Sequence, residues 1–489
     1  MIITIVAIDN KNGIGKDGSI PWYISDDLKF FKSMSLTQYS VNNDKKPNIL
    51  IMGRKTWEST NYYMFPNREV IIISKSHKFN KPLPPNFCSA ISCDSISILS
   101  LSKNRDVIII GGETIYDYFW KFSHIIFLTK IYKNYNCDRF FPKFPTDNLN
   151  LFKLVKKSDM KFDENENTYY QFTEYHNVDI LQTNNPYLCT HLNISNNNSE
   201  KKYLDLLKHV LENGKLRKTR NAETISYFGT QLEFDISNTF PLLTTKRVFW
   251  KGVIEELIWF IKGNTDNTEL KDKGVHIWDG NSTTEFLKKY GHPYEENICG
   301  PIYGWQWRRF NEKYYYTNRE THDVNNTKGE ENGFDQLNEI IRLIKEDPHS
   351  RRIFMSGWNP NQLEHMVLPP CHTSYQFYVE DDKLSCHMYQ RSGDLFLGVP
   401  FNIASTSALT YILAKMTDKK PDRVIISFGD VHIYDSHIDA VKKQIERTPY
   451  SYPVLNIKEK REKIEDYTSD DFEIIGYDCH PAIKAEMIA

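Results

Sequence analysis

The chain has 489 residues, well beyond the roughly 250 to 300 at which a single hydrophobic core stops growing, so at least two domains are expected. Hydrophobic residues at 40% and charged residues at 25%, with 28 Phe and 29 Tyr to fill cores, argue against a disordered protein. A formal net charge of -2 argues against a dedicated nucleic-acid partner or a membrane-surface binder, and favours local basic clusters that bind small anions.

The cysteines and the first residues bear on the compartment. Eight Cys show no C-x-x-C spacing and are too sparse for a disulfide scaffold, which favours a reducing environment. The opening MIITIVAID has no basic region and reaches Asp9 too early for a signal peptide. No apolar run approaches the roughly 20 residues that span a bilayer. We therefore expect a cytoplasmic protein with no membrane partner.

The first part of the chain alternates apolar runs with helical or loop segments, the runs being ITIVAI, NILIM, VIIIS, VIIIGG and IIFLTK. This pattern predicts an α/β domain with a mostly parallel sheet and flanking helices. The alternating strand TYYQFTEYH closes it. A polar, Asn-rich stretch then predicts a linker over residues 178–198, which leaves residues 1–177 as the first domain.

Asp27 is the candidate acid of this half. It lies in the first turn of a predicted helix, where such acids often serve only to cap, but Asp26 can fill that role. Leu28 and Phe31 follow Asp27 at i+1 and i+4 and are expected to face a core or a ligand. A carboxyl against an apolar wall can accept two hydrogen bonds from an amino-pyrimidine edge, and burial favours its protonated form.

A glycine pair provides the candidate phosphate site. Gly111-Gly112 precedes a predicted helix, so it allows backbone to approach a phosphate closely, although a plain tight turn explains it as well. Arg54, Lys55 and Lys75 supply cations suited to a 2'-phosphate, which indicates NADPH rather than NADH, although surface solvation explains any one of them as well.

Five motifs, Gly13-Ile14-Gly15, Pro21-Trp22, Asp27, the segment MGRKTW from Met52 and the segment IGGET from Ile110, make this half resemble the dihydrofolate reductase family. The resemblance implies that Asp27 serves dihydrofolate and that Arg68 binds the glutamate carboxylate of the folate. It implies further folate contacts by Val6, Phe31, Ile110, Tyr116 and Thr129. It implies NADPH contacts by Ala7, Ile14, Gly15, Lys16, Gly53, Arg54, Lys55, Thr56, Ser74, Lys75, Gly111, Gly112, Glu113 and Thr114.

The second domain is expected over residues 199–489. A helix should begin at Ser199 and stop at Gly214, and FWKGVIEELIWFIKG predicts another. TISYFGTQLEF, LSCHMYQRS and RVIISFGDVHIY predict strands, so this is an α+β domain. The polar insert over residues 311–333 predicts a surface loop.

Cys371, in the segment PPCH, is the candidate nucleophile, although a lone Cys is usually a small buried hydrophobe. The same half carries QRSGD from Gln390, PFNIA from Pro400, DPHSRR from Asp347 and HIY from His432. With these motifs it resembles the thymidylate synthase family. A thiolate that adds to C6 of uracil makes C5 nucleophilic, and an adjacent Arg391 would lower the thiol pKa.

Three polar positions of this half each have a structural alternative. Asn402 can donate to O4 and accept from N3–H of uracil, which favours dUMP, or it can be a helix N-cap. Glu256, on an apolar helix, can organise proton transfers through water or be a satisfied core acid. His432, with Tyr434, can bind the ribose or be an inward strand residue.

The resemblance implies a catalytic set of Cys371, Glu256, Arg391 and Tyr303, and folate contacts by Trp278, Asn281 and Asp394. It implies dUMP contacts by Arg220, Arg351, Arg352, His372, Gln390, Arg391, Ser392, Gly393, Asp394, Asn402, His432 and Tyr434. Arg351 and Arg352 would reach over from a second subunit, although an exposed charged turn also explains the pair, so the active enzyme would be a homodimer. After Arg220 the family usually reads Thr-Gly, whereas this chain reads Asn221-Ala222.

The two implied activities form one cycle and resemble the bifunctional enzymes of protozoa. The synthase uses 5,10-methylenetetrahydrofolate as cosubstrate and releases dihydrofolate, which the reductase returns to tetrahydrofolate with NADPH; no metal is expected. A regulator that kept the fold and lost the chemistry is one alternative, and reduction of another pterin is a second. The presence of Cys371, Asp27 and Arg68 favours the enzyme.

Overall fold

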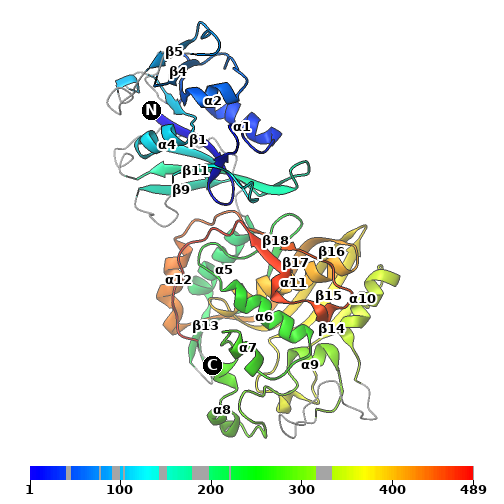
Figure 1. Cartoon of the computed structure of the whole chain (residues 1–489). Helices are drawn as coiled ribbons and strands as arrows, with labels where there is room; N and C mark the ends of the chain where they lie inside the picture. Colours follow the sequence, from blue (N-terminus) through cyan, green and yellow to red (C-terminus); the bar gives the residue numbers. More distant parts are fainter. Residues whose placement is uncertain are drawn as a thin grey trace. The chain divides into compact units, whose positions relative to one another are not determined.

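The computed structural model describes residues 1–39, 46–75, 79–90, 100–102, 105–142, 151–178, 198–219, 222–314 and 333–487. The chain divides into two compact units, Met1–Asn196 and Asn197–Ala489, which run from blue to cyan and from green to red in Figure 1. Most of the expected linker and most of the expected insert lie outside the described residues.

The first unit is built on a nine-stranded sheet and a small two-stranded one. Its strands are β1 (Ile2–Ile8), β2 (Gly13–Gly15), β3 (Ile49–Gly53), β4 (Glu69–Ile73), β5 (Phe87–Ala90), β6 (Val107–Ile109), β7 (Ile125–Ile131), β8 (Arg139–Phe140), β9 (Phe152–Lys157), β10 (Lys161–Asp163) and β11 (Thr168–Asn177). Its helices are α1 (Ser25–Leu36), α2 (Arg54–Ser59) and α4 (Glu113–Phe119). The large sheet has the order β10-β11-β7-β1-β6-β3-β4-β5, with β9 also paired to β11.

Every pair from β7 to β5 in that order is parallel, whereas β11 runs antiparallel to β7. This confirms the predicted mostly parallel sheet. The central strands are continuous Ile- and Val-rich runs because both faces are covered. Residues of α4 pack on one face, and residues of α1 and α2 pack on the other.

The second unit contains a six-stranded sheet of order β12-β13-β17-β16-β15-β14 and a two-stranded sheet. Its strands are β12 (Lys215–Lys218), β13 (Glu223–Asp235), β14 (Phe354–Ser356), β15 (His372–Glu380), β16 (Lys383–Asp394), β17 (Lys420–Tyr434), β18 (Val454–Ile457) and β19 (Phe472–Ile475). Its helices are α5 (Asn198–Asn213), α6 (Trp250–Ile261), α7 (Thr268–Asp272), α8 (Thr284–Lys289), α9 (Tyr303–Arg308), α10 (Gln336–Glu346), α11 (Gly398–Met416) and α12 (Ile438–Ile445).

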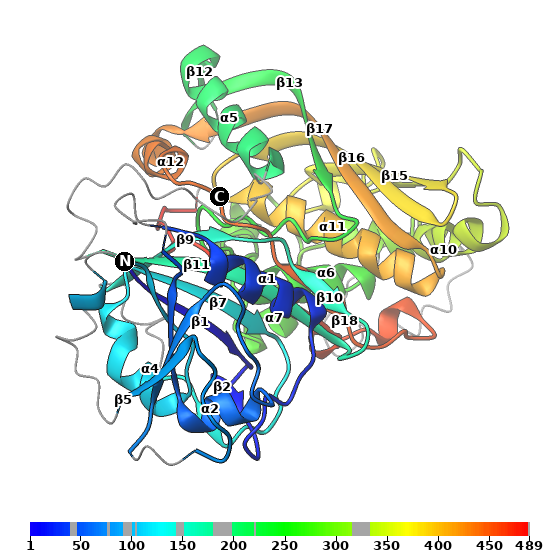
Figure 2. The same ribbon diagram turned by 90° about the horizontal axis from the view of Figure 1, so that it is seen from above.

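The predicted strands and the apolar helix of this unit are present as β13, β16, β17 and α6. The sheet is antiparallel except for the β16–β17 pair. Helix α11 lies along β16 and β17, as Figure 2 shows, and α5 packs on β13. These layers enclose one large apolar core.

The other face of this sheet presents side chains to solvent. Tyr378 of β15 is 58% exposed and Tyr389 of β16 is 42% exposed, and both lie among polar neighbours. His387 and Gln231 bond to the same hydroxyl, Ser427 Oγ, at 2.8 and 2.9 Å. This face therefore exposes aromatic and polar side chains. Across the described ranges, no helix has the length and apolar character needed to cross a membrane.

Candidate active sites

Asp27 lies in the first turn of α1, half-buried against β7. Thr129 Oγ1 of β7 donates a 2.6 Å hydrogen bond to Asp27 Oδ1. Burial raises the pKa of Asp27 to about 6, and the Thr129 hydrogen bond offsets part of that rise. The carboxyl can therefore hold a proton close to physiological pH.

The capping explanation for the acids of α1 does not hold. The N-cap is Ile24, and no side chain caps the helix. Asp26 instead bonds to Lys161 Nζ at 2.9 Å, and its ion pairs lower its pKa to about 2. Leu28 was expected to face a core or a ligand, and at 50% exposed it does not belong to the core. Only Phe31 of that pair packs against the core.

The Gly111-Gly112 pair joins β6 to α4 with no room for side chains. Gly111 has φ +106°, and a Cβ on it would lie 2.8 Å from Tyr116 Cε2. A Cβ on Gly112 would lie 3.0 Å from Thr56 Oγ1. Tyr116 is itself fixed, because its hydroxyl donates to Ile5 O at 2.8 Å. The bare backbone of this turn fits close approach by a dinucleotide, and it lies beside Thr56.

The basic residues of this half differ in their environments. Arg54 Nη1 pairs with Glu58 Oε1 at 2.6 Å, whereas Lys55 and Lys75 are exposed. Arg68 is 3% exposed, its Nη1 donates to Ser35 Oγ of α1 at 2.6 Å, and burial lowers its pKa. Arg68 therefore has a fixed place below α1.

The remaining reductase positions gather at the carboxyl edge of the parallel strands, where ligands bind open α/β sheets. Ala7 of β1 pairs in register with Thr129 of β7, and Val6 precedes it. This edge also carries Ile110 after β6, Gly53 at the end of β3, Ser74 after β4, and Glu113 and Thr114 at the start of α4. Ile14 and Gly15 belong to β2, which pairs with β8, and Lys16 follows it and bridges to Ser19. Gly13 N donates to Asp9 Oδ1 at 2.7 Å.

Cys371 immediately precedes β15 and lies beside Arg391 and Tyr303. Cys371 N donates to Tyr303 Oη at 2.7 Å, and Arg391 N donates to Cys371 O at 2.9 Å. The Arg391 guanidinium holds the preceding turn through Pro370 O at 2.9 Å and Pro369 O at 2.7 Å. Burial raises the pKa of the Cys371 thiol, and the charge of Arg391 and the bond with Tyr303 oppose that rise. The expected effect of Arg391 is present but smaller than that of burial.

Glu256 of α6 points to Trp278, whose Nε1 donates to Glu256 Oε1 at 2.8 Å. Burial raises the pKa of Glu256 to about 7, and the Trp278 bond lowers it in part. Tyr303 stacks on Phe260 of the same helix at 4.8 Å and has its own pKa raised by burial. Glu256 is thus a carboxyl that can exchange a proton near neutral pH. Asn281 ends the short helix η2 (Asp279–Asn281) three residues after Trp278.

Asn402, Gln390 and His372 form a buried amide and imidazole cluster. Gln390 Nε2 donates to Asn402 Oδ1 at 2.9 Å. His372 is 6% exposed, and burial lowers its pKa to about 4, although a hydrogen bond with Asn402 opposes that fall. Helix α11 begins at Gly398 with Leu397 as N-cap, so Asn402 lies in the second turn. The N-cap explanation for Asn402 is therefore wrong.

The parallel β16–β17 pair brings the end of QRSGD next to HIY. Asp394 pairs in register with His432, and Ser392 with Asp430, while Gly393 lies between them. Asp430 Oδ1 bonds to His432 Nδ1 at 2.9 Å, which leaves Nε2 as the outward nitrogen of the ring. The ring of Tyr434 lies 5.2 Å from that of His432.

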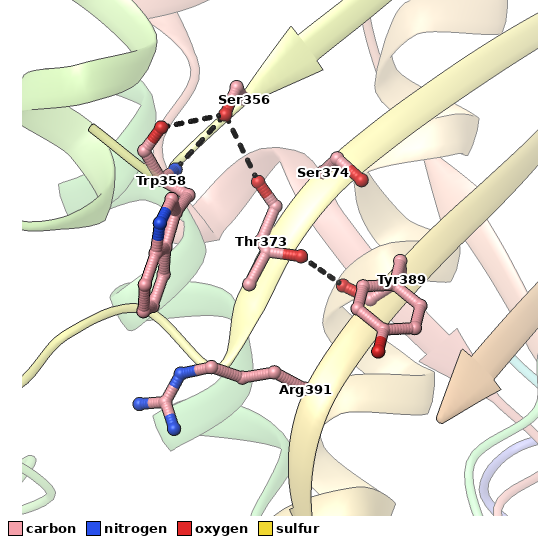
Figure 3. Close-up of a pocket in the computed structure, with 6 residues that line it drawn as sticks. All are labelled: Ser356, Trp358, Thr373, Ser374, Tyr389 and Arg391. Carbon is pink, nitrogen blue, oxygen red and sulfur yellow. Dashed lines mark hydrogen bonds between the residues drawn. The ribbon is translucent and has the colours of Figure 1, made fainter. Parts of the chain in front are cut away.

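Of the expected phosphate ligands, Arg351, Arg352 and Arg391 lie among the described residues. Arg220 lies outside the described residues. Arg351 and Arg352 are exposed in the loop between α10 and β14. Arg391 lines a hollow of about 340 Å³ on the exposed face of the sheet. Figure 3 shows its guanidinium below Trp358, 5.5 Å from that ring, with Ser356, Thr373, Ser374 and Tyr389 around the hollow.

Asp430 and Lys246 stand out by their geometry and were not predicted from the sequence, and Trp22, which the sequence placed in a motif, has a distinctive environment as well. Asp430 orients His432, and its place at i−2 on the same strand face was an available signal. Lys246 is 5% exposed, bonds to Phe396 O and lies 3.6 Å from the Phe396 ring, and burial lowers its pKa to about 7. Trp22 is buried with no hydrogen-bond partner for Nε1 among the described residues.

Comparisons with known proteins match each half of the chain to a family. The dihydrofolate reductase family matches residues 1–177, and the thymidylate synthase family matches residues 201–489. The bifunctional dihydrofolate reductase-thymidylate synthase of Zea mays is 39% identical over 99% of this chain and 96% of its own length. The proteins of that name from Paramecium tetraurelia and Leishmania major are 38% and 37% identical over 99% of this chain and 98% and 94% of their own lengths.

The matched domains define two activities. The first is an oxidoreductase that reduces dihydrofolate with NADPH, and the second is a methyltransferase that converts dUMP to dTMP with methylenetetrahydrofolate. Because whole-length relatives carry both domains in this order, the chain belongs to the bifunctional dihydrofolate reductase–thymidylate synthase family.

Proposed function

We propose that Asp27 is the acid of the reductase site. Its half-buried carboxyl, with Thr129 on one oxygen and a pKa of about 6, suits both hydrogen bonding to the amino-pyrimidine edge of dihydrofolate and supply of a proton to the ring being reduced. Arg68 binds the glutamate carboxylate, and Phe31 with the backbone of Val6 and Ile110 surrounds the pterin. The hydrogen bond between Asp27 and Thr129 supports this assignment most directly.

The residues around the glycine pair fit NADPH. A side chain at Gly111 or Gly112 would collide with Tyr116 or Thr56, so the turn keeps backbone free for a phosphate. Arg54, Lys55 and Lys75 bind the 2'-phosphate, and Thr56 orients the nicotinamide end. Bound NADPH supplies the hydride, while the protein positions it and excludes water.

For the synthase we propose that Cys371 adds as thiolate to C6 of dUMP. Burial raises the pKa of this thiol and the charge of Arg391 opposes the rise, so Arg391 favours the thiolate that the addition needs. Arg391 also binds the phosphate together with Ser392 and Arg220. Glu256 and Tyr303 organise proton transfers at the base. The juxtaposition of Cys371, Arg391 and Tyr303 carries this assignment.

Recognition of the base and sugar follows from the buried cluster. Asn402 presents an amide to O4 and N3–H of uracil, and Gln390 and His372 hold that amide in orientation. His432 and Tyr434 bind the ribose hydroxyl. Trp278, Asn281 and Asp394 contact the folate.

We further propose a homodimer through the synthase sheet, with Arg351 and Arg352 of each subunit completing the phosphate site of the other. The exposed aromatic face around Tyr378 and Tyr389 is the kind of surface that a second copy covers. Arg351 and Arg352 are exposed and make no ion pair among the described residues, which suits a role toward a partner.

A subunit-mixing experiment tests this proposal. Cys371→Ser and the double variant Arg351→Ala with Arg352→Ala are each inactive as synthases if both groups are needed. After mixing, unfolding and refolding together, half of the dimers are mixed and each holds one intact site, so about a quarter of wild-type activity returns. No recovery, in dimers shown to have exchanged subunits, would refute sharing of the phosphate site.

We propose residues 1–177 as the reductase domain, 178–198 as the linker and 199–489 as the synthase domain. We place the enzyme in the cytoplasm, on the ground that its sparse cysteines, six of which are free in the described part of the chain, suit a reducing compartment. Fractionation of cells that produce the native chain, followed by immunoblotting, tests this location.

A further inference from the structure

His437 is a fully buried histidine that the mechanism above does not use. It ends the short helix η4 (Asp435–His437), which follows β17, and it is 0% exposed. Its ring lies among aromatic neighbours, 5.5 Å from Phe396 and 5.4 Å from Tyr434. A buried imidazole is stable only when its nitrogens have hydrogen-bond partners, so the surroundings of each nitrogen bear on its role.

One nitrogen of His437 holds the C-terminal segment, residues 479–487. Nε2 lies 2.7 Å from Glu486 O, and a carbonyl only accepts, so Nε2 carries the proton. The rest of that segment has its own anchors: His480 N donates to Thr244 O at 2.7 Å, and Arg447 Nη1 donates to Pro481 O at 2.7 Å. His437 therefore fixes the last stretch, which those anchors do not reach.

The other nitrogen faces Asp394. Nδ1 is buried without a hydrogen-bond partner among the described residues, and it lies 4.0 Å from Asp394 Oδ1. That oxygen already accepts from Phe396 N at 2.9 Å and Leu397 N at 3.2 Å, so the carboxylate is held in this orientation. An unpaired buried nitrogen is costly, and here it lies between the segment and a proposed folate ligand.

We propose that His437 is a positioning residue of the synthase, which holds the C-terminal segment next to Asp394 so that the segment borders the folate site. The inference rests on the proposed contact of Asp394 with folate. The imidazole lies between the two: Nε2 bonds to the segment, and Nδ1 lies 4.0 Å from Asp394 Oδ1. Loss of this imidazole releases the segment and weakens the binding of folate. The binding of dUMP, which depends on Arg391 and Asn402, is unchanged.

Two substitutions separate the nitrogens. A Gln amide reaches the place of Nε2, so His437→Gln keeps the bond to Glu486, whereas the shorter amide of His437→Asn takes the place of Nδ1 and loses that bond. Tyr411→Phe is the control: it removes a 2.7 Å bond to Ile236 O elsewhere in the same unit.

The measurements are the KM for methylenetetrahydrofolate, the Kd for dUMP without folate, and amide exchange of residues 483–487, all on the full chain. For His437→Asn we expect about a tenfold higher folate KM, a dUMP Kd within about twofold of wild type, and faster exchange in the segment. His437→Gln and Tyr411→Phe should keep wild-type exchange there.

An unchanged folate KM in His437→Asn, or equal losses in folate and dUMP binding, would overturn the proposal. Wild-type exchange of the segment in that variant would overturn it as well. Failure of the folate assignment is separable, because Asp394→Asn would then leave the folate KM unchanged while His437→Asn still frees the segment.

Discussion

Replacement of Asp27 by Asn is expected to stabilise the reductase unit at neutral pH while it removes reductase activity. The folded pKa of Asp27 is about 6, against an ordinary value of 3.8. The folded protein therefore binds this proton more tightly than the unfolded chain, and it loses stability as pH rises from about 4 to about 6. Above that window the folded protein bears the full free-energy cost of burying a charged carboxylate, and an uncharged Asn avoids this cost.

The size of the effect follows from the shift. A difference of about 2 pKa units corresponds to about 3 kcal/mol, and water near the half-buried carboxyl reduces this to about 1 to 2 kcal/mol. Asn can still accept from the Thr129 hydroxyl, so the substitution adds no cavity. Loss of the proton donor should lower reductase kcat by about 10²-fold or more.

The assay is the free energy of opening from amide exchange in β1, β6 and β7, measured on the full chain between pH 5 and 8. The increase in the free energy of opening that Asp27→Asn causes should be smallest at pH 5 and should level off above pH 7. Asp26→Asn is the matched control of opposite sign: its lowered pKa means that the carboxylate stabilises the fold above about pH 4, so its removal should destabilise. A variant at Asp27 that is less stable than wild type at pH 8, or whose gain does not change with pH, would refute the reasoning.

Three further substitutions test separate parts of the two sites. Arg68→Leu should raise the KM for dihydrofolate about 10- to 100-fold and leave that for NADPH within about twofold in steady-state assays, because a charge-assisted hydrogen bond is lost; equal effects would contradict the assignment. Asn402→Asp should lower kcat/KM for dUMP about 10²-fold and give measurable turnover of dCMP, because an acid suits the cytosine edge; an unchanged preference between the two nucleotides would count against it. Asp430→Asn frees His432 Nδ1 from its 2.9 Å bond, so the KM for dUMP should rise about tenfold with little change for methylenetetrahydrofolate, and the reverse pattern would show that His432 does not serve the nucleotide.

Periodicity in the sequence was sufficient to predict the framework. The Ile- and Val-rich runs that became β1, β3 and β6 are buried on both faces, and that requirement is visible in the residues themselves. The apolar helix α6 and the long strands β13, β16 and β17 were predicted for the same reason. The contacts of side chains at the ends of helices and strands were harder to predict, because residues distant in the sequence determine them.

The acids of α1 illustrate this limit. Local sequence favoured capping by Asp26, but Lys161, which is 135 residues away, draws that carboxylate off the helix end. The sequence left an N-cap open as the alternative role of Asn402, because the start of α11 could not be placed to within a turn. Lys246 differs, because its contact with Phe396 joins residues 150 positions apart and exists only in the folded chain. Asp430 lies two residues before His432 on the same strand, so its contact could have been predicted from the sequence.

The most direct test of the whole account is a near-ultraviolet time course on the purified chain. The protein receives dUMP and methylenetetrahydrofolate first, and NADPH is added only after the absorbance has stopped changing. The Cys371→Ser variant is measured in parallel. We predict a rise as dihydrofolate forms, then a fall that depends on NADPH. In the variant the rise should be absent, while added dihydrofolate is still reduced. No rise in the wild type, or a rise that survives the substitution, would contradict the assignment of Cys371 as the nucleophile.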